Sequence, residues 1–388
     1  MKTVTVTKKG ATRVRHGHLW IYRSDVVEVD AAGGSIVSVK DERGNFIGQA
    51  LYSAASQIAL RFLTQTTEEI DRDWWRRRIR EAVARRKVSA DTNAYRLVYS
   101  EGDLLPSLIV DRYNDVLVLQ TLSQGTEAFK SLFAEILIDE FQPRAVIERN
   151  DARVRELEGL PLISATVYGD APEEIEIRQH GLRFVVSPGA GQKTGSFLDQ
   201  RENRLAARAA AQTTTHRRAL DCFTFNGAFA LHLASVCEEV VGIDISADAV
   251  AAAKRNAELN EMRNVEFREA NVFDALREME TAGERFDCVV LDPPAFAKNR
   301  ASLKSALRGY KEINLRALKL LNAGGVLLTC TCSYHVAEDL FLEIVADAAS
   351  DAHRRVQIIE KRMQASDHPV LLGMPETYYL KCVITRVV

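Results

Sequence analysis

The chain has 388 residues, of which 46% are hydrophobic and 27% are charged, and its formal net charge is −2. This composition is typical of a globular protein with two or three domains, and it argues against a generally basic nucleic-acid-binding protein. The sequence has no apolar run of membrane-spanning length, no apolar signal-peptide region and no Cys-x-x-Cys spacing among its six cysteines. These absences predict a cytoplasmic protein with reduced thiols, no membrane contact and no metal site.

Residues 1–70 are predicted to form a small β domain. Four short segments alternate β-branched residues as strands do: TVTVT, SIVSVKD, FIGQALYS and QIALRFLT. The segment 13–22 mixes cations and aromatic residues, and Arg13 and Arg15 are candidates to bind RNA phosphates. The alternative is a solvated basic edge with Trp20 in the core, and the sequence leaves both interpretations open.

Residues 71–186 are predicted to form an α+β middle domain. A helix over 71–87 would place Trp74, Ile79 and Val83 on one face and a set of arginines on the other. The arginine face could lie along RNA or could simply be solvated. The remaining predicted elements are a hairpin around 114–115, a helix over 126–140, a strand over 145–148 and a hairpin around 180–181.

Residues 187–388 alternate strands and helices, which predicts a mainly parallel Rossmann-like sheet with helices on both faces. The last strand follows a long loop and could run antiparallel. The expected strands lie at 219–223, 240–243, 265–268, 286–291, 325–330, 356–360 and 378–387.

The segment 219–246 reads as strand, tight loop, helix and strand. Asp244 ends the second strand, where a carboxylate can accept hydrogen bonds from a ribose diol. The loop contains Gly227 but no G-x-G-x-x-G, since Phe223 and Phe225 stand where glycines would be needed for a pyrophosphate. A nucleoside cofactor without a pyrophosphate, such as S-adenosyl-L-methionine (SAM), fits this loop better. The alternative is an ordinary β-α-β unit without a ligand.

Further polar residues follow the other predicted strands and should meet at the same edge of the sheet. Asn271 could hold an adenine amine, and Pro293 and Pro294 fix the backbone beside Asp292. The segment 193–201 precedes the sheet and could close over the cofactor. The expected cofactor-binding residues are Phe223, Thr224, Gly227, Asp244, Ile245, Asn271, Asp292, Gln200 and Arg201.

Two thiols lie at or just past the end of the strand expected at 325–330, and one of them suggests a reaction. Addition of a thiolate to C6 of a pyrimidine makes C5 nucleophilic enough to take a methyl group. Cys332 falls past the expected strand end, whereas Cys330 would still lie within it. We therefore expect Cys332 to be the nucleophile and Asp292 to hold the base. The alternative is that both cysteines are small buried hydrophobic residues.

Together these stretches resemble the class I SAM-dependent methyltransferases that make 5-methylcytosine in large-subunit (23S) ribosomal RNA. The resemblance covers essentially the whole chain and implies an N-terminal PUA domain over 1–70, a middle domain over 71–186 and a methyltransferase domain over 187–388. In that family the cysteine of the TCS element, here Cys332, is the expected nucleophile. The stretches that carry the resemblance are KTGSFLDQRENR, LDCFTFNGAFA, VVGIDIS, LDPPAFAKN, RGYKEIN, TCTCS and SDHPVLLGMPETYYLK.

The resemblance implies ribosomal RNA as the partner and is compatible with a homodimer. The expected RNA-contacting residues are Arg13, Arg15, Pro293, Pro294 and Lys311. Two departures stand out: Ala295 follows the prolines where many relatives carry a second cysteine, and Asn271 replaces a common aspartate. The group that removes the C5 proton is therefore unassigned. Two other interpretations remain, an RNA methyltransferase acting on a base nitrogen and a non-catalytic RNA-binding or assembly factor.

Overall fold

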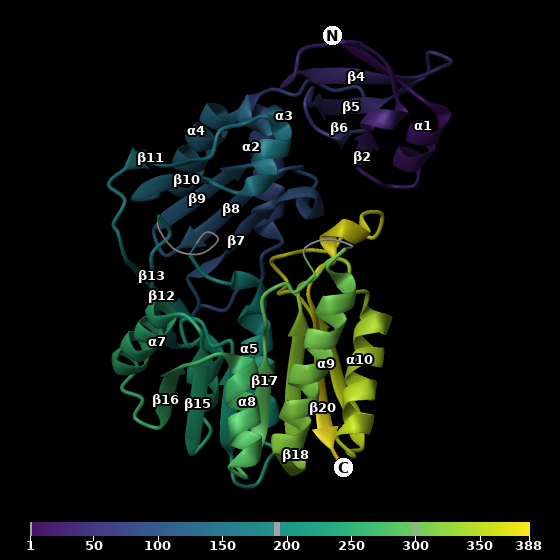
Figure 1. Ribbon diagram of the computed structural model, residues 1–388. Coiled ribbons are helices and arrows are strands. Elements are labelled where there is room, and N and C mark those ends of the chain that lie inside the picture. The colour runs from purple at the N-terminus through teal and green to yellow at the C-terminus, as the bar shows by residue number, and fades with distance from the viewer. Residues whose placement is uncertain (1, 190–194, 298–300) are drawn as a thin grey trace. The chain divides into compact units, whose positions relative to one another are not determined.

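The computed structural model describes residues 2–189, 195–297 and 301–388. The chain forms two compact units (Figure 1). The N-terminal unit comprises Met1–Ile177, Val186–Leu198 and Ser366–Tyr378, and the C-terminal unit comprises Arg178–Val185, Asp199–Ala365 and Tyr379–Val388. The expected boundaries after residues 70 and 186 stay a prediction, and the assignment of Ser366–Tyr378 to the N-terminal unit is a feature that chain order does not reveal.

The first sheet of the N-terminal unit has the strand order β2-β6-β5-β4-β1-β3. The four predicted strands are confirmed, and residues 8–15, for which no element was predicted, form α1 (Lys8–Arg15). Thr7 caps this helix by accepting a hydrogen bond from the Gly10 amide. The strands are β1 (Thr3–Val6), β2 (Trp20–Tyr22), β3 (Val26–Asp30), β4 (Ile36–Asp41), β5 (Phe46–Tyr52) and β6 (Ile58–Thr64).

The second sheet of this unit has the order β11-β10-β9-β8-β7. The hairpin predicted around 114–115 is confirmed, because Asn114 adopts the left-handed conformation that a tight turn requires (φ 57°). The helix predicted over 126–140 is instead two helices, α3 (Gln124–Glu127) and α4 (Lys130–Phe141). The strands are β7 (Ala94–Tyr99), β8 (Leu108–Tyr113), β9 (Val116–Thr121), β10 (Ala145–Asn150) and β11 (Ile163–Gly169).

Helix α2 (Arg72–Ala84) packs its apolar face into the core of this second sheet. Asp71 caps the helix, and Trp74, Ile79 and the unforeseen Trp75 are buried. The Trp75 ring lies 5.0 Å from the Phe133 ring of α4, so aromatic packing holds the two helices together.

The C-terminal unit is built on a seven-stranded sheet with the order β16-β15-β14-β17-β18-β20-β19. The strands from β16 to β18 are parallel, while β20 is antiparallel to both β18 and β19, so the expected reversal of the last strand is confirmed. The strands are β14 (Arg218–Cys222), β15 (Glu239–Asp244), β16 (Val265–Glu269), β17 (Phe286–Leu291), β18 (Leu321–Thr331), β19 (Val356–Met363) and β20 (Lys381–Val387). The separate hairpin predicted around 180–181 is confirmed as β12 (Ile175–Gln179) and β13 (Leu182–Val186).

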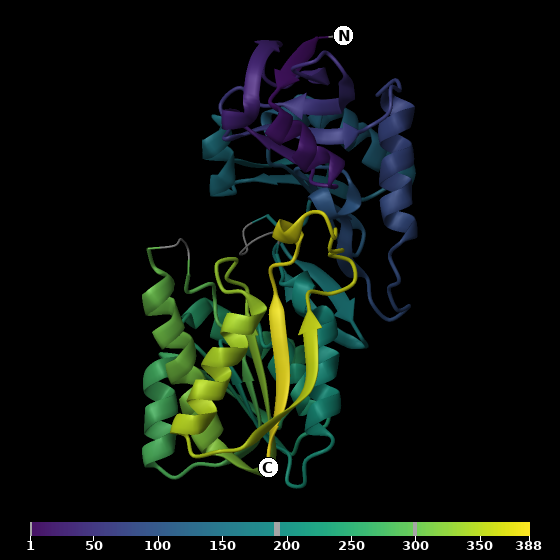
Figure 2. The ribbon, with the colours of Figure 1, turned by 90° about the vertical axis from the view of Figure 1, so that its right-hand side faces the viewer.

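Helices cover both faces of the seven-stranded sheet, as predicted (Figures 1 and 2). One face carries α8 (Val272–Thr281), α9 (Leu303–Leu320) and α10 (Glu338–Asp351), which bury a continuous apolar core. The other carries α5 (Arg201–Ala211), α6 (Ala228–Ala234) and α7 (Ala247–Leu259). In the part of the chain that the structure describes, no helix is long and apolar enough to cross a membrane.

Candidate active site

The loop that joins β14 to α6 bends sharply at the carboxyl edge of the sheet. Phe223, Phe225 and Gly227 all have positive φ angles, of 64°, 49° and 82°. Such conformations are unfavourable for phenylalanine and are retained where the surroundings fix the backbone. A side chain at Gly227 would meet the Phe267 ring at 2.9 Å, so the turn needs a glycine. Between these residues, Thr224 is buried and its amide donates to the Ile243 carbonyl of β15 at 2.9 Å.

A buried carboxylate, which the sequence reasoning did not single out, lies under this loop. Asp221 Oδ2 accepts hydrogen bonds from Thr224 Oγ1 at 2.5 Å and from the Ala230 amide at 2.9 Å. Its Oδ1 has no hydrogen-bond partner in the protein, although the residue is 0% exposed. Burial raises the pKa of Asp221 to about 7, against the opposing effect of those two hydrogen bonds. The sequence feature that could have pointed to Asp221 was its position near a strand end, within LDCFTFNG.

Asp244 ends β15 and turns its carboxylate toward the same loop. Its Oδ2 accepts from the Phe225 amide at 2.9 Å, and its Oδ1 accepts from the Ser246 amide at 3.0 Å. Each carboxylate oxygen has a further lone pair, so a ribose diol could still donate to both. The neighbouring Ile245 side chain is 68% exposed, which leaves an apolar surface beside the carboxylate for a flat base.

Asn271 follows β16, as expected, but it also has a structural role. It is the N-cap of α8, and its Oδ1 accepts from the Phe273 amide at 2.9 Å. The residue is exposed, and its amide group keeps a second oxygen lone pair and both N–H donors. The departure from aspartate therefore preserves a helix cap and leaves polar capacity for an adenine edge.

Asp292 lies just beyond β17 and is held by Gln200. The Gln200 Nε2 donates to Asp292 Oδ1 at 2.7 Å, and its Oε1 accepts from Asn203 at 2.7 Å. Arg201 is 1% exposed and lies next to Gln200 at the start of α5. Gln200 thus connects the segment before the sheet to the end of the fourth strand, while closure over a cofactor stays a prediction. Lys193, Thr194, Lys298 and Asn299 lie outside the described residues.

The two thiols near the end of β18 lie in different environments. Cys330 is 0% exposed within the strand, opposite Cys382, and burial together with that neighbour raises the pKa of its thiol well above the ordinary value. Cys332 comes after the last strand residue, Thr331, and is partly exposed. The expectation that only Cys332 falls past the strand end is confirmed.

A tyrosine from α9 fixes the backbone on either side of Cys332. Thr331 Oγ1 donates to the Tyr310 hydroxyl at 2.9 Å, and the Ser333 hydroxyl lies 2.9 Å from the same oxygen. Ser333 also accepts from the Ala297 amide at 3.2 Å, which ties this loop to the one that follows Asp292. Sequence reasoning missed Tyr310, although it stands in the quoted stretch RGYKEIN.

The aromatic ring after the two prolines belongs to a cluster. Pro293 is buried and Pro294 is exposed. The Phe296 ring lies 4.7 Å from Tyr310, 6.0 Å from Phe273 and 6.3 Å from Phe223. These contacts join the loop between β14 and α6 to the loop of Cys332 through packed rings.

The expected RNA-contacting cations are all engaged within the protein. Arg13 pairs with Asp25 at 2.9 Å, Arg15 pairs with Asp41 at 3.3 Å, and Lys311 pairs with Asp351 of α10 at 2.9 Å. Lys311 lies in the middle of α9 and faces α10, and its predicted contact with RNA stays a prediction. The cations Arg13 and Arg15 of the basic segment 13–22 are therefore less available to bind RNA than the composition of the segment suggested.

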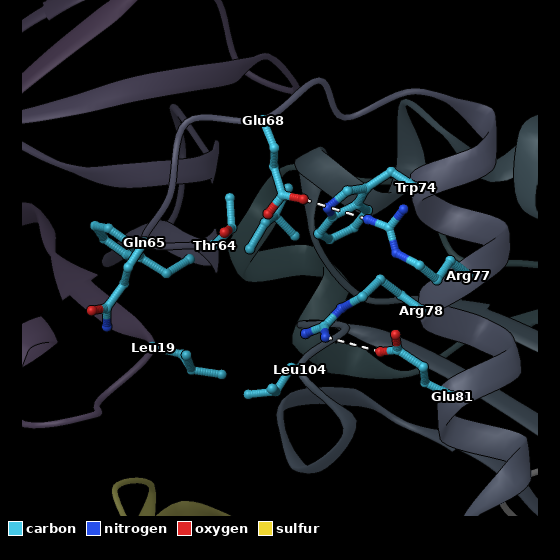
Figure 3. A pocket seen from close by; sticks show the side chains of 11 residues that line it. Leu19, Thr64, Gln65, Glu68, Trp74, Arg77, Arg78, Glu81 and Leu104 are labelled. Atoms are coloured by element: carbon cyan, nitrogen blue, oxygen red, sulfur yellow. Dashed lines mark hydrogen bonds and ion pairs between the residues drawn. The ribbon is translucent and has the colours of Figure 1, made fainter.

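The arginine face of α2 is neutralised in the same way. Arg72 and Arg80 form ion pairs with acids of α4, among them Asp139 at 2.9 Å and Glu140 at 2.6 Å. A pocket of about 300 Å³ lies beside this helix (Figure 3). Arg77 and Arg78 border it, and Glu68 and Glu81 pair with them, so its charged lining is balanced. The pocket is lined by Leu19, Phe62, Leu63, Thr64, Gln65, Glu68, Trp74, Arg77, Arg78, Glu81 and Leu104.

Comparison with known proteins identifies the domains. Residues 4–65 match the PUA-like domain, and residues 162–372 match the S-adenosylmethionine-dependent methyltransferase family. A solved structure described as a methyltransferase candidate complexed with SAH covers 100% of both chains with a TM-score of 0.85 at 20% identity, which supports the fold. The geometry around Asp221 and Asp244, with an unpartnered buried oxygen and a carboxylate placed for a diol, fits SAM as the cofactor of this family.

Curated relatives match over nearly the full length. The ribosomal RNA large subunit methyltransferase I of Tolumonas auensis is 41% identical over 100% of this chain and 99% of its own length. The protein of the same name from Escherichia coli is 40% identical over 95% of each chain. The chain therefore belongs to the ribosomal RNA large subunit methyltransferase I family, as a SAM-dependent methyltransferase with an N-terminal PUA-like domain.

Proposed function

We propose that this protein methylates C5 of a cytosine in large-subunit ribosomal RNA through a covalent adduct on Cys332. The observation that carries the proposal is the position of this thiol. Cys332 is partly exposed directly after β18, on a backbone that Tyr310 fixes through Thr331 and Ser333. The names of the full-length relatives support ribosomal RNA as the substrate.

The proposed roles follow from the chemistry of carbon 5. The Cys332 thiolate adds to C6, and the electron pair of the C5–C6 double bond makes C5 nucleophilic. SAM supplies the methyl group that C5 takes up. Loss of the C5 proton to a base and departure of the thiolate then restore the double bond. In this scheme Asp292, oriented by Gln200, holds the N3/N4 edge of the cytosine, which has left its stack.

The roles of the cofactor-binding residues are proposals as well. Asp244 would hold the ribose hydroxyls, and Ile245 and Asn271 would contact the adenine. Phe223, Thr224 and Gly227 shape the loop, and Gln200 and Arg201 stand at the start of α5 beside Asp292. A homodimer remains a proposal that no contact described above requires.

Methylation of a base nitrogen is the alternative reaction. Enzymes that use Asp-Pro-Pro followed by an aromatic residue hold the target amine against that ring. Here Ala295 intervenes, and the Phe296 ring packs against Tyr310, Phe273 and Phe223. This packing favours the C5 reaction, in which a ring of that kind is not needed.

Analysis of the methylated product tests the proposal. Ribosomal RNA from cells that lack the protein should be incubated with SAM and enzyme, digested to nucleosides and analysed by mass spectrometry. We expect one new 5-methylcytosine with wild-type protein and with Cys330→Ser, and none with Cys332→Ser. Methylation on a nitrogen, or full activity of Cys332→Ser, would contradict the proposal.

A further inference from the structure

A nearly buried lysine begins the strand next to Cys332. Lys381 is the first residue of β20 and is the cross-strand partner of Thr331, the residue before Cys332. It is only 4% exposed, and its Nζ donates to the Tyr379 carbonyl at 3.3 Å. Burying a lysine side chain costs free energy unless its charge is paired or its amine is hydrogen-bonded.

The charged groups around Lys381 indicate which side chain its ammonium can interact with. Burial lowers the pKa of Lys381, while Cys332 and Glu338 act in the opposite direction by favouring its charged form. Glu338 is also engaged elsewhere, since Lys361 donates to it at 2.7 Å. On the α9 side, burial raises the pKa of Tyr310, which keeps that hydroxyl neutral. Lys381 is thus a cation on β20, cross-strand from the residue before Cys332, whose charge can interact with that thiol.

We propose that Lys381 is a positioning residue that stabilises the thiolate form of Cys332. This inference rests on the proposed function, because it assumes that Cys332 reacts as a thiolate. Attraction between the ammonium and the thiolate is reciprocal, so a charge that Cys332 stabilises must in turn stabilise Cys332.

The proposal adds no new chemical step. The thiol proton leaves to solvent, and the ammonium of Lys381 keeps its own protons throughout. When the Cys332 sulfur bonds to C6, its negative charge moves into the pyrimidine ring. When the C–S bond breaks, the thiolate returns to the same ammonium. The lysine therefore acts on both addition and release.

Thiol alkylation measures this effect without RNA. The rate of iodoacetamide reaction at Cys332 should be followed from pH 6 to 10 by mass spectrometry of the Cys332 peptide, in full-length wild type, Lys381→Met and Lys381→Arg. We expect Lys381→Met to move the midpoint upward by at least about one pH unit, which lowers the thiolate fraction near neutral pH about tenfold. Lys381→Arg should keep the midpoint near that of wild type. Lys319→Met, on α9 and paired with Glu280, is the matched control and should change nothing.

A merely structural role predicts a different result. An unchanged midpoint in Lys381→Met would overturn the proposal, and so would equal shifts in the methionine and arginine variants when both keep wild-type SAM affinity and circular dichroism. The test is separable from that of the proposed function. If wild-type enzyme methylates a nitrogen, the C5 reaction fails, whereas the alkylation midpoints still decide whether Lys381 stabilises the thiolate.

Discussion

The carboxyl edge of the seven-stranded sheet and the α2–α4 helix pair are both rich in charged residues, but the charges are used differently. At the sheet edge, Asp221 has a buried oxygen without a partner and Asp244 keeps lone pairs beside an exposed Ile245. Between α2 and α4, arginines such as Arg80 are matched with acids such as Glu140. Carboxylates with spare acceptor capacity at the strand ends therefore mark the site, whereas a high density of charge alone does not.

The sheet edge also carries strain that the helix pair lacks. Phe223 and Phe225 hold positive φ angles in the loop over Asp221. A buried carboxylate oxygen without a partner lowers the stability of the fold, and so does a strained phenylalanine backbone. Such costs are typical of functional sites. The sheet edge thus serves function at a cost in stability, whereas the ion pairs between α2 and α4 serve the fold. The following predictions test this difference, from the largest expected effect to the smallest.

Asp221→Asn should change the pH dependence of stability most. Burial, opposed by the Thr224 and Ala230 hydrogen bonds, raises the pKa of Asp221 to about 7 in the folded protein, from an ordinary value of 3.8. The native state therefore binds more protons than the unfolded state between those pH values, so this group's contribution is complete below about pH 4 and is lost as pH rises to 7. The loss can reach about 1.4 kcal/mol per pH unit, and the asparagine variant should not show it.

The free energy of unfolding should be measured by urea denaturation at each pH from 4 to 8, with hydrogen exchange of β14 peptides as the readout. Glu258→Gln, at an exposed position of α7, is the control and should keep the wild-type slope. Identical slopes in wild type and Asp221→Asn would show that the buried carboxylate does not titrate in this range.

Asp244→Ala should weaken SAM binding by about 1.5–3 kcal/mol, because it removes a charged acceptor of hydrogen bonds. Isothermal titration calorimetry measures the affinity directly. Asp248→Ala removes an exposed acid four residues further along and should have little effect. If the two variants bind SAM equally well, Asp244 does not hold the ribose.

Arg80→Ala should have the smallest effect, since Glu140 already neutralises this arginine at 2.6 Å. The slope of RNA affinity against salt concentration should stay as in wild type, whereas loss of a phosphate contact would lower it by about 0.7–0.9. Glu140→Ala provides the reverse control, because it exposes the arginine and should strengthen RNA binding. A lower salt-dependence slope in Arg80→Ala would indicate that α2 does contact RNA.

Strand ends were the features that the sequence predicted well. Asp244, Asp292 and Cys332 follow from alternating strands and helices, because parallel strands bring their carboxyl ends to one edge. Partners from distant segments could not be predicted: Asp139 and Glu140 of α4 neutralise α2, and composition counts charges without showing what faces them. Tyr310 and Lys381 were missed for the same reason, since only the folded sheet brings α9 and β20 beside Cys332.

Covalent trapping tests the central claim most directly. RNA with 5-fluorocytosine at the target position should form a stable adduct after methyl transfer, because fluorine cannot leave as a proton does. On denaturing gels we predict the adduct in wild type and Cys330→Ser and its absence in Cys332→Ser. An adduct that persists in Cys332→Ser and disappears in Cys330→Ser would move the nucleophile to Cys330. The absence of any adduct, together with methylation on a nitrogen, would contradict the C5 mechanism.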